Sequence, residues 1–254
     1  MLRSLKDLKG YVVSATDGDL GAINDFLLDD QEWAIRYVVA NSSAWLPGRR
    51  VLVSPSSITN AHADWASRRV QVELTRQQVK NSPGIESDEP VSRQLERELS
   101  SYYRWPEYWL GPKGASAPVG AVNRGIAGTA LADRPAPREP TGDPNLRSFK
   151  EVTGYHIVAL DGEIGHVEDL VADDETWSIR YVVVDTRNWL PGRKVLVSPA
   201  WIRSIDWAGE TVQVDLQCEQ IKSSPEFNPS SPVNREYETR LYDYYGRPKY
   251  WQAS

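Results

Sequence analysis

The chain has 254 residues, of which 40% are hydrophobic and 25% charged, and its formal net charge is −6. This length suffices for two domains, and no run approaches the roughly 18 to 20 apolar residues of a membrane-spanning helix. The acidic balance disfavours nucleic-acid binding, because contacts to phosphates require a basic surface. The single cysteine, Cys218, excludes an internal disulfide or a thiolate cluster. Residues 1–10 lack the apolar core of a signal peptide, so we expect a cytoplasmic protein.

An internal repeat is the main feature of the sequence. Residues 2–55 align without gaps on residues 146–199, and 29 of the 54 aligned positions are identical. After a shift of two residues the match continues to the end of the chain. We interpret the repeat as a duplication that gives two modules, residues 1–110 and 146–254. The segment between them, residues 111–145, is rich in Ala, Gly and Pro and is predicted to be a flexible linker.

The first module is expected to consist of short strands followed by helix. Strands are predicted at residues 11–14, 21–28, 34–41, 50–54 and 69–74. Asp17-Gly18, with Asp161-Gly162 in the second copy, indicates a tight hairpin between the first two strands. A glycine follows at Gly21, where the strand is expected to bend or to approach another backbone closely. Five short strands with tight turns favour a small closed or nearly closed barrel.

A helical and aromatic extension is predicted after the strands of each module. Residues 75–81 form one or two helical turns that end at Ser82-Pro83. Residues 92–103 have the spacing of an amphipathic helix, and the aromatic run 105–109 is expected to pack on a surface. The predicted fold class is therefore mainly β, with two tandem small barrels that each carry a short C-terminal helical and aromatic extension.

Two motifs in each copy carry a resemblance to a known family. In the second copy they are Asp-Gly-Glu-Ile-Gly at residues 161–165 and a run from Ile-Arg-Tyr-Val-Val to Val-Leu-Val-Ser-Pro at residues 179–199. The first copy has similar motifs at residues 17–21 and 35–55. These motifs resemble the PRC-barrel family, whose fold is shared by the cytoplasmic part of the photosynthetic reaction-centre H chain and the C-terminal domain of a ribosome maturation factor.

The resemblance implies a role in assembling or tuning larger complexes through protein contacts. It supplies no set of catalytic residues. The chain also departs from both named relatives, because it shows neither the membrane helix of the H chain nor the N-terminal barrel of the maturation factor. Neither specific function is carried over.

Carboxylates and histidines are the candidate metal ligands. Three aspartates recur in both copies, as Asp25, Asp29, Asp30, Asp169, Asp173 and Asp174. Clustered oxygens suit a hard cation, but aspartate also shapes solvated turns, and no calcium-loop motif is present. The histidines are His62, His156 and His166. The last two are expected to face each other across a hairpin, without an obvious third ligand for zinc.

No catalytic motif occurs in the sequence. There is no nucleophile elbow, phosphate-cradling loop, His-Glu-x-x-His or Cys-x-x-Cys spacing. We therefore predict that the protein is not an enzyme and that it has no cofactor and no catalytic or metal site.

Arginine and aromatic side chains are the candidate interface residues. Arginine beside tryptophan is typical of interface hot spots, can stack on RNA bases, or can hold the long hairpin through cation–π contacts. The aromatic tails are further candidates for the surface between the modules or toward a partner. The candidate residues are Arg36, Trp45, Arg49, Tyr103, Trp109, Arg180, Trp189, Arg193, Tyr245 and Trp251.

The leading functional hypothesis is a non-enzymatic protein-binding or assembly module whose two barrels pair as an internal pseudo-dimer. It would support a larger complex, of the electron-transfer or ribosome-related kind, through an unidentified protein partner. The sequence leaves a homo-oligomer open. Two alternatives stay open as well: a sensor that binds a small ligand or a divalent metal, and an RNA- or ribosome-associated factor.

Overall fold

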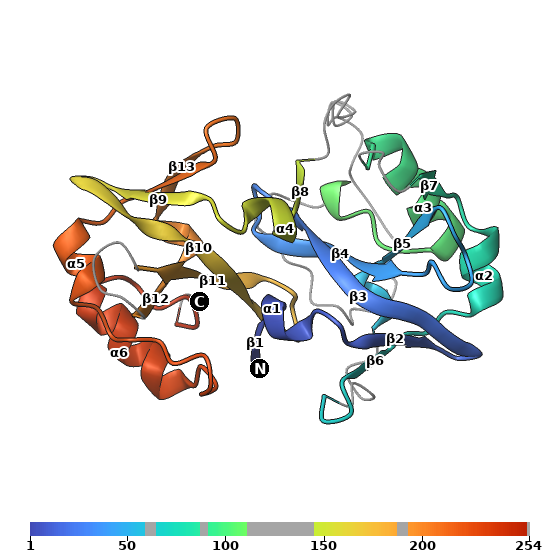
Figure 1. Ribbon diagram of the computed structural model, residues 1–254, viewed down its shortest axis with the longest axis horizontal. Helices are drawn as coiled ribbons and strands as arrows, with labels where there is room; N and C mark the ends of the chain where they lie inside the picture. Colours follow the sequence, from blue (N-terminus) through green and yellow to red (C-terminus); the bar gives the residue numbers. More distant parts are fainter. Residues whose placement is uncertain (59–64, 87–90, 111–144, 187–192, 253–254) are drawn as a thin grey trace, which may run out of the picture.

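The fold consists of two seven-stranded sheets that lie side by side along the long axis of the molecule (Figure 1). The computed structural model describes residues 1–58, 65–86, 91–110, 145–186 and 193–252. The predicted linker therefore lies outside the described residues, except for Asn145.

Both halves begin with a strand, a one-turn helix and a hairpin. The first half contains β1 (Leu2–Ser4), α1 (Leu5–Leu8), β2 (Val12–Ala15), β3 (Gly18–Asp29), β4 (Ala34–Asn41), β5 (Arg49–Val53), η1 (Pro55–Ser57), β6 (Arg69–Gln71), α2 (Arg76–Asn81), β7 (Ile85–Glu86), α3 (Arg93–Tyr103) and η3 (Tyr108–Leu110). The second half contains β8 (Leu146–Ser148), α4 (Phe149–Val152), β9 (His156–Ala159), β10 (Gly162–Asp173), β11 (Ile179–Asp185), β12 (Lys194–Val197), η4 (Pro199–Trp201), β13 (Ile202–Asp206), β14 (Thr211–Val214), α5 (Cys218–Lys222) and α6 (Arg235–Tyr245).

The predicted Asp-Gly hairpins are confirmed in both halves, because β2 pairs antiparallel with β3 and β9 with β10. The glycine after each turn lies against another backbone. Gly21 has a φ of +136°, and a Cβ there would lie 1.8 Å from the carbonyl oxygen of Asn41. Gly165 has a φ of +154°, and a Cβ there would lie 2.0 Å from the carbonyl oxygen of Asp185. Only glycine fits such an approach.

The predicted helices are also confirmed. Thr75 caps α2 through a reciprocal capping box with Gln78, and the helix ends before Ser82. Ser92 caps α3, which coincides with the amphipathic helix predicted at residues 92–103 and buries Leu99.

The first strand of each half belongs to the sheet of the other half. β1 pairs antiparallel with β10, where Leu2 lies opposite Asp173. In the same way β8 pairs antiparallel with β3, where Leu146 lies opposite Asp29. The exchange is reciprocal, so each sheet contains one strand from the other half. The sequence predicted two modules from separate segments, residues 1–110 and 146–254, whereas in the structure each sheet contains a strand of the other segment.

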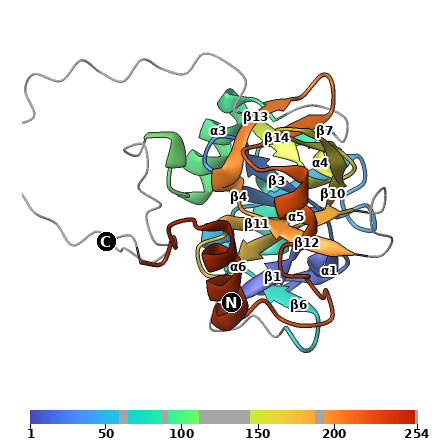
Figure 2. The same cartoon turned by 90° about the vertical axis from the view of Figure 1, so that its left-hand side faces the viewer.

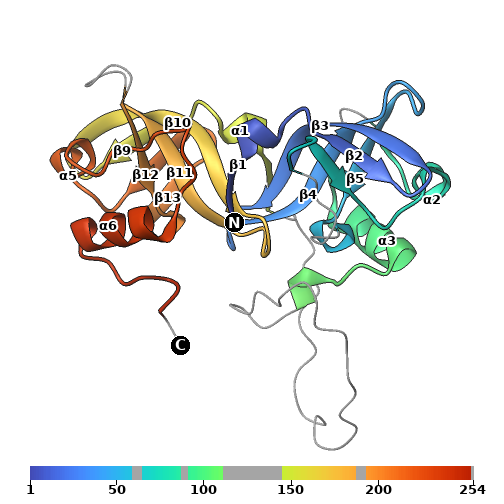
Figure 3. The same cartoon turned by 90° about the horizontal axis from the view of Figure 1, so that it is seen from below.

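The one-turn helices extend this exchange into the core. α1 lies against β10 and buries Leu5 and Leu8, whereas α4 lies against β3 and buries Phe149 and Val152. The Phe149 ring packs edge-on against Phe26 of β3, with 6.2 Å between the ring centroids. Figure 3 shows α1 at the junction between the two halves. Buried apolar side chains thus join the halves as they would join two layers of one domain.

A second junction joins the ends of the long hairpins. The Ile35 backbone N–H donates to the Trp177 carbonyl oxygen at 2.8 Å, and the Ile179 N–H donates to the Trp33 carbonyl oxygen at 2.7 Å. These two bonds are equivalent under the sequence repeat. The halves therefore meet through backbone hydrogen bonds and through exchanged strands.

Neither sheet closes into a barrel among the described residues. The second sheet has the order β12-β11-β10-β9-β14-β13, and the first has the order β6-β2-β3-β4-β5-β7. Helix and aromatic side chains cover the second sheet in place of closing strands: Tyr242 of α6 contacts Trp201 with 5.3 Å between the ring centroids. Viewed from that end, α5 and α6 lie in front of the strands (Figure 2). In the part of the chain that the structure describes, no helix is long and apolar enough to cross a membrane.

Candidate binding cleft between the two halves

An open cleft of about 920 Å³ lies where the halves meet. Residues of both halves line it, so it exists only in the joined molecule. Its described lining is Asp30, Gln31, Glu32, Trp33, Asn145, Arg147, Ser178, Ile179, Arg180, Ser198, Pro199, Ala200, Trp201, Ile202, Arg203, Ser204, Ile205, Trp207, Tyr242, Arg247, Pro248 and Tyr250.

The β3–β4 turn forms the wall from the first half. Asp29 shapes this turn, because its carboxylate accepts the backbone N–H groups of Gln31 and Glu32 at 2.9 and 3.1 Å. Trp33 then takes a φ of +50°, a left-handed conformation that few non-glycine residues adopt. The turn presents a half-buried indole and two acidic side chains, Asp30 and Glu32, to the cleft.

Arginine side chains form much of the polar lining. Arg147 donates to Asp30 at 3.1 Å and lies over the Trp207 ring at 4.5 Å. Arg180 lies over the Tyr250 ring at 4.3 Å, and its Nε is buried without a hydrogen-bond partner among the described residues. Arg180 and Arg247 also pair with carboxylates, Asp173 at 3.8 Å and Asp215 at 3.0 Å. Of the four guanidinium groups that line the cleft, Arg203 is thus the one without a carboxylate partner among the described residues.

The strand β13 forms the wall from the second half. Among the residues that the structure describes, it is the last strand of its sheet and pairs only with β14. Ile202, Arg203, Ser204 and Ile205 of this strand all line the cleft. The cleft therefore brings together an edge strand, indole rings and basic side chains, which is a composition suited to binding a protein segment.

The recurring aspartates hold the exchanged strands in place. Asp169 accepts hydrogen bonds from the Ser4 hydroxyl and from the Lys6 backbone N–H, the latter at 3.0 Å. Asp25 makes the equivalent bonds to Ser148 and Lys150. Burial raises the pKa of Asp169 to about 6, against the lowering effect of these hydrogen bonds.

The other recurring aspartates bind arginine. Asp174 accepts from Arg3 at 2.6 Å, and Asp30 accepts from Arg147. The arrangement favours a structural role for these carboxylates over the cation site weighed from the sequence.

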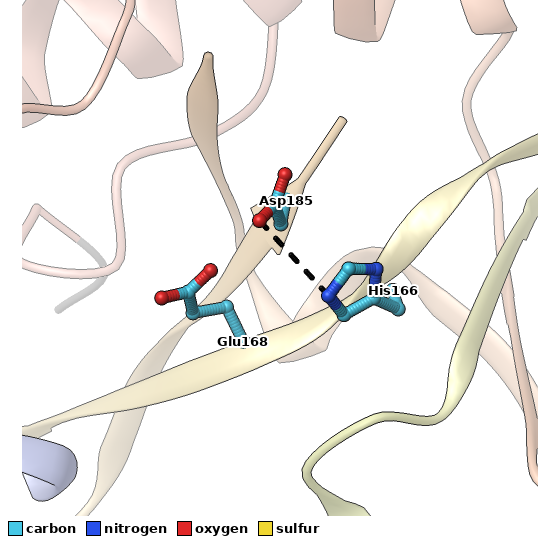
Figure 4. Close-up of side chains that lie close together, drawn as sticks. All are labelled: His166, Glu168 and Asp185. Atoms are coloured by element: carbon cyan, nitrogen blue, oxygen red, sulfur yellow. Dashed lines mark ion pairs between the residues drawn. The ribbon is translucent and has the colours of Figure 1, made fainter. Parts of the chain in front are cut away.

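One group of side chains has the composition of a metal site. His166 Nε2 lies 4.0 Å from an oxygen of Asp185, and Glu168 is close to both (Figure 4). Glu168, however, already accepts hydrogen bonds from Lys194 at 2.7 Å and from Lys6 at 2.9 Å. Burial raises its pKa, but the hydrogen bonds from the Lys194 and Lys6 ammonium groups act the other way, and the pKa is lowered to about 2. A cation would have to displace two ammonium groups, so the group fits an ion network better than a metal site.

His156 and His166 lie opposite each other in the strand register, as the sequence predicted. Each contacts a different carboxylate: His156 Nδ1 lies 2.9 Å from Glu163, and His166 Nε2 lies 4.0 Å from Asp185. His62 lies outside the described residues.

The predicted interface arginines make contacts inside their own halves. Arg36 lies over the Tyr108 ring at 3.9 Å, and Arg180 makes the equivalent contact with Tyr250. Cation–π contacts therefore do occur: those of Arg36 and Arg180 hold the aromatic tails, and Trp45 of the hairpin has one from Arg76, which lies over its ring at 4.6 Å. Arg49 donates to the carbonyl oxygens of Lys80 and Ser82, and Arg193 donates to that of Ser224. Of the four arginines, Arg180 alone lines the cleft.

The predicted interface aromatics also pack within their own halves. Trp45 Nε1 donates to the Leu20 carbonyl oxygen, Tyr103 stacks on Trp105, and Trp109 lies beside Arg93. Tyr245 contacts Trp201, and Trp251 lies beside Arg235. Trp189 lies outside the described residues. The described contacts of the tails are therefore local, and the junction between the halves is formed by the exchanged strands.

Sequence reasoning missed the buried glutamates that anchor the tails. Glu96 is fully buried and accepts from the Tyr108 hydroxyl at 2.6 Å, and Glu238 accepts from the Tyr250 hydroxyl at 2.8 Å. Glu96 of α3 and Glu238 of α6 occupy equivalent positions in the sequence repeat, and this recurrence could have identified them. Arg147, Arg203 and Trp207 of the cleft were missed as well, because nothing in the local sequence brings them together.

The strands and turns of the second half also carry a family match. Residues 144–216 match the model of the PRC-barrel domain. This part of the second half is similar to the PRC-barrel domain. The match runs from β8 to β14, so this PRC-barrel segment includes the strand that pairs with the sheet of the first half. No curated protein matches the chain.

Proposed function

We propose that the protein is a non-enzymatic protein-binding or assembly module that acts in the cytoplasm. Its two halves form an internal pseudo-dimer by strand exchange, which we attribute to duplication of a homodimeric ancestor. A protein partner, itself part of a larger complex, binds in the cleft between the halves.

The composition of the cleft carries this proposal. Trp33, Trp201 and Trp207 line it together with four arginines, and tryptophan and arginine are the residues most enriched at interface hot spots. The halves that form its walls are joined by backbone pairing and by buried side chains. A cleft held in this way loses little entropy when a partner binds.

The test is to block the cleft sterically with a bulky label, so that the result does not depend on which chemical groups of the partner bind there. In a Cys218→Ser background, Ser204→Cys is labelled with a bulky maleimide, and Arg240→Cys, an exposed position outside the cleft, is labelled as the control. We expect the unlabelled protein and the control to retain the same partner proteins from the native host. Loss of these proteins with labelled Ser204→Cys supports the proposal, and equal retention overturns it.

A further inference from the structure

The two ends of the second sheet differ in how their edges are covered. At one end β12 is covered, because Val195 forms a bridge with Glu226 and the Phe227 N–H donates to the Lys194 carbonyl oxygen at 2.8 Å. At the other end β13 has no strand beside its outer edge among the described residues. An uncovered edge is a template for pairing with another chain, and proteins usually protect such edges.

The open edge runs along the cleft. β13 pairs antiparallel with β14 of the second half (both labelled in Figure 2). A bulge at Arg203 places Ile202 and Ile205 opposite the buried residues Val214 and Val212. Both isoleucines are half-buried, whereas Arg203 and Ser204 are exposed. A strand added at this edge would therefore have an apolar row beside the isoleucines and a polar row beside Arg203.

The charge of Arg203 determines which polar side chains of an added strand fit beside it. Arg203 has no charged or hydrogen-bonding partner among the described residues, although the cleft contains two carboxylates. Asp30 is already bonded to Arg147. An exposed arginine on an open strand edge, without a carboxylate partner among the described residues, is complementary to an acidic segment, whereas the net charge of −6 repels nucleic acid.

We propose that the cleft binds an extended acidic segment of a protein partner, which adds as a strand to the free edge of β13 with its carboxylates toward Arg203. This inference rests on the proposed function and specifies the chemistry of the partner. Backbone hydrogen bonds would supply affinity, and the alternating apolar and acidic side chains would supply specificity.

A defined peptide library tests the inference on the full chain. The probes are fluorescein-labelled Ac-(Val-X)₅-NH₂ peptides in which X is Glu, Lys or Ser in all combinations, and binding is followed by fluorescence anisotropy. We expect affinity to rise with the number of Glu residues. N-methylation of alternate backbone nitrogens should abolish binding, because it removes the donors for strand pairing.

Matched variants locate the site. Arg203→Glu should weaken binding of the all-Glu peptide about fivefold or more, whereas Arg240→Glu, with its exposed arginine outside the cleft, should leave it unchanged. Affinity that is independent of peptide charge, or insensitive to N-methylation, overturns the inference. Tighter binding of labelled oligouridylate overturns it in favour of nucleic acid. If Ser204→Cys labelling releases partner proteins but no library peptide binds, this inference fails and the proposed function stands.

Discussion

Asp169 lies where the exchanged N-terminal strand meets the sheet of the second half, and it is 7% exposed. Its pKa of about 6 in the folded protein exceeds the ordinary value of 3.8, chiefly because burial disfavours the charge. Between these two pH values the folded state holds a proton that the unfolded state has released. The contribution of Asp169 to the free energy of unfolding is therefore greatest below about pH 4 and declines as pH rises through about 6.

We expect Asp169→Asn to remove this pH dependence. The difference in unfolding free energy between wild type and variant should change by up to about 3 kcal/mol from pH 4 to pH 7. Urea unfolding at several pH values measures it, and carboxyl carbon NMR gives the titration midpoint directly. A midpoint at or below 3.8 would contradict the expectation.

Gly165 tests the close backbone approach in the long hairpin. A Cβ at this residue would lie 2.0 Å from a carbonyl oxygen, whereas Gly154 has a φ of +100° but nothing within 4 Å. Gly154→Ala suffers backbone strain alone and should cost about 1 kcal/mol, and Gly165→Ala suffers strain and a clash and should cost about 3 kcal/mol or more. Thermal unfolding of both variants checks the ranking, and equal destabilisation would show that the sheet yields at this point.

At the scale of elements, the packing of α1 on the sheet of the other half can be tested by substitution. Leu5 is fully buried, and α1 lies against β10 of the other half. We expect Leu5→Ala to destabilise the protein by about 2–5 kcal/mol and to increase hydrogen exchange in β10, far from the substitution in sequence. Val13→Ala, in β2 of the first half, should instead increase exchange in β3. If Leu5→Ala affected only the first residues of the chain, the exchange of strands would be refuted.

Local patterns predicted the individual elements well. The Asp-Gly turns and the Ser82-Pro83 stop each determine nearby backbone, so hairpins and helices could be predicted. The exchange could not, because residues 2–4 and 146–148 are both Leu-Arg-Ser. Either strand fits either sheet, and only the three-dimensional path of the chain decides between them.

The cleft could not be predicted for a related reason. Asp30, Arg147, Arg203 and Trp207 are scattered along the sequence and meet only because the halves are joined. The sequence predicted a closed or nearly closed barrel, and no closed barrel is found among the described residues. Period-two alternation shows that a strand has one buried face but not what covers that face. In the second half, Tyr242 of α6 and Trp201 supply part of that cover.

At the scale of the molecule, strand exchange makes the two halves a single unit, and this can be tested by cutting the chain. A protease site inserted between residues 114 and 133 and then cleaved removes the covalent link. Separation of the halves would still require β1 and β8 to leave their sheets and would expose Leu5 and Phe149 to water.

We therefore expect the cleaved protein to sediment at micromolar concentration as one species with the mass of the whole chain, while a denaturing gel shows two fragments. The cleaved Leu5→Ala, Phe149→Ala double variant serves as the control and should separate at higher concentration than the wild type, because both side chains are part of the exchanged surface. Separate halves of the wild type at micromolar concentration would mean that the covalent link, and not the exchanged strands, keeps the cleft together.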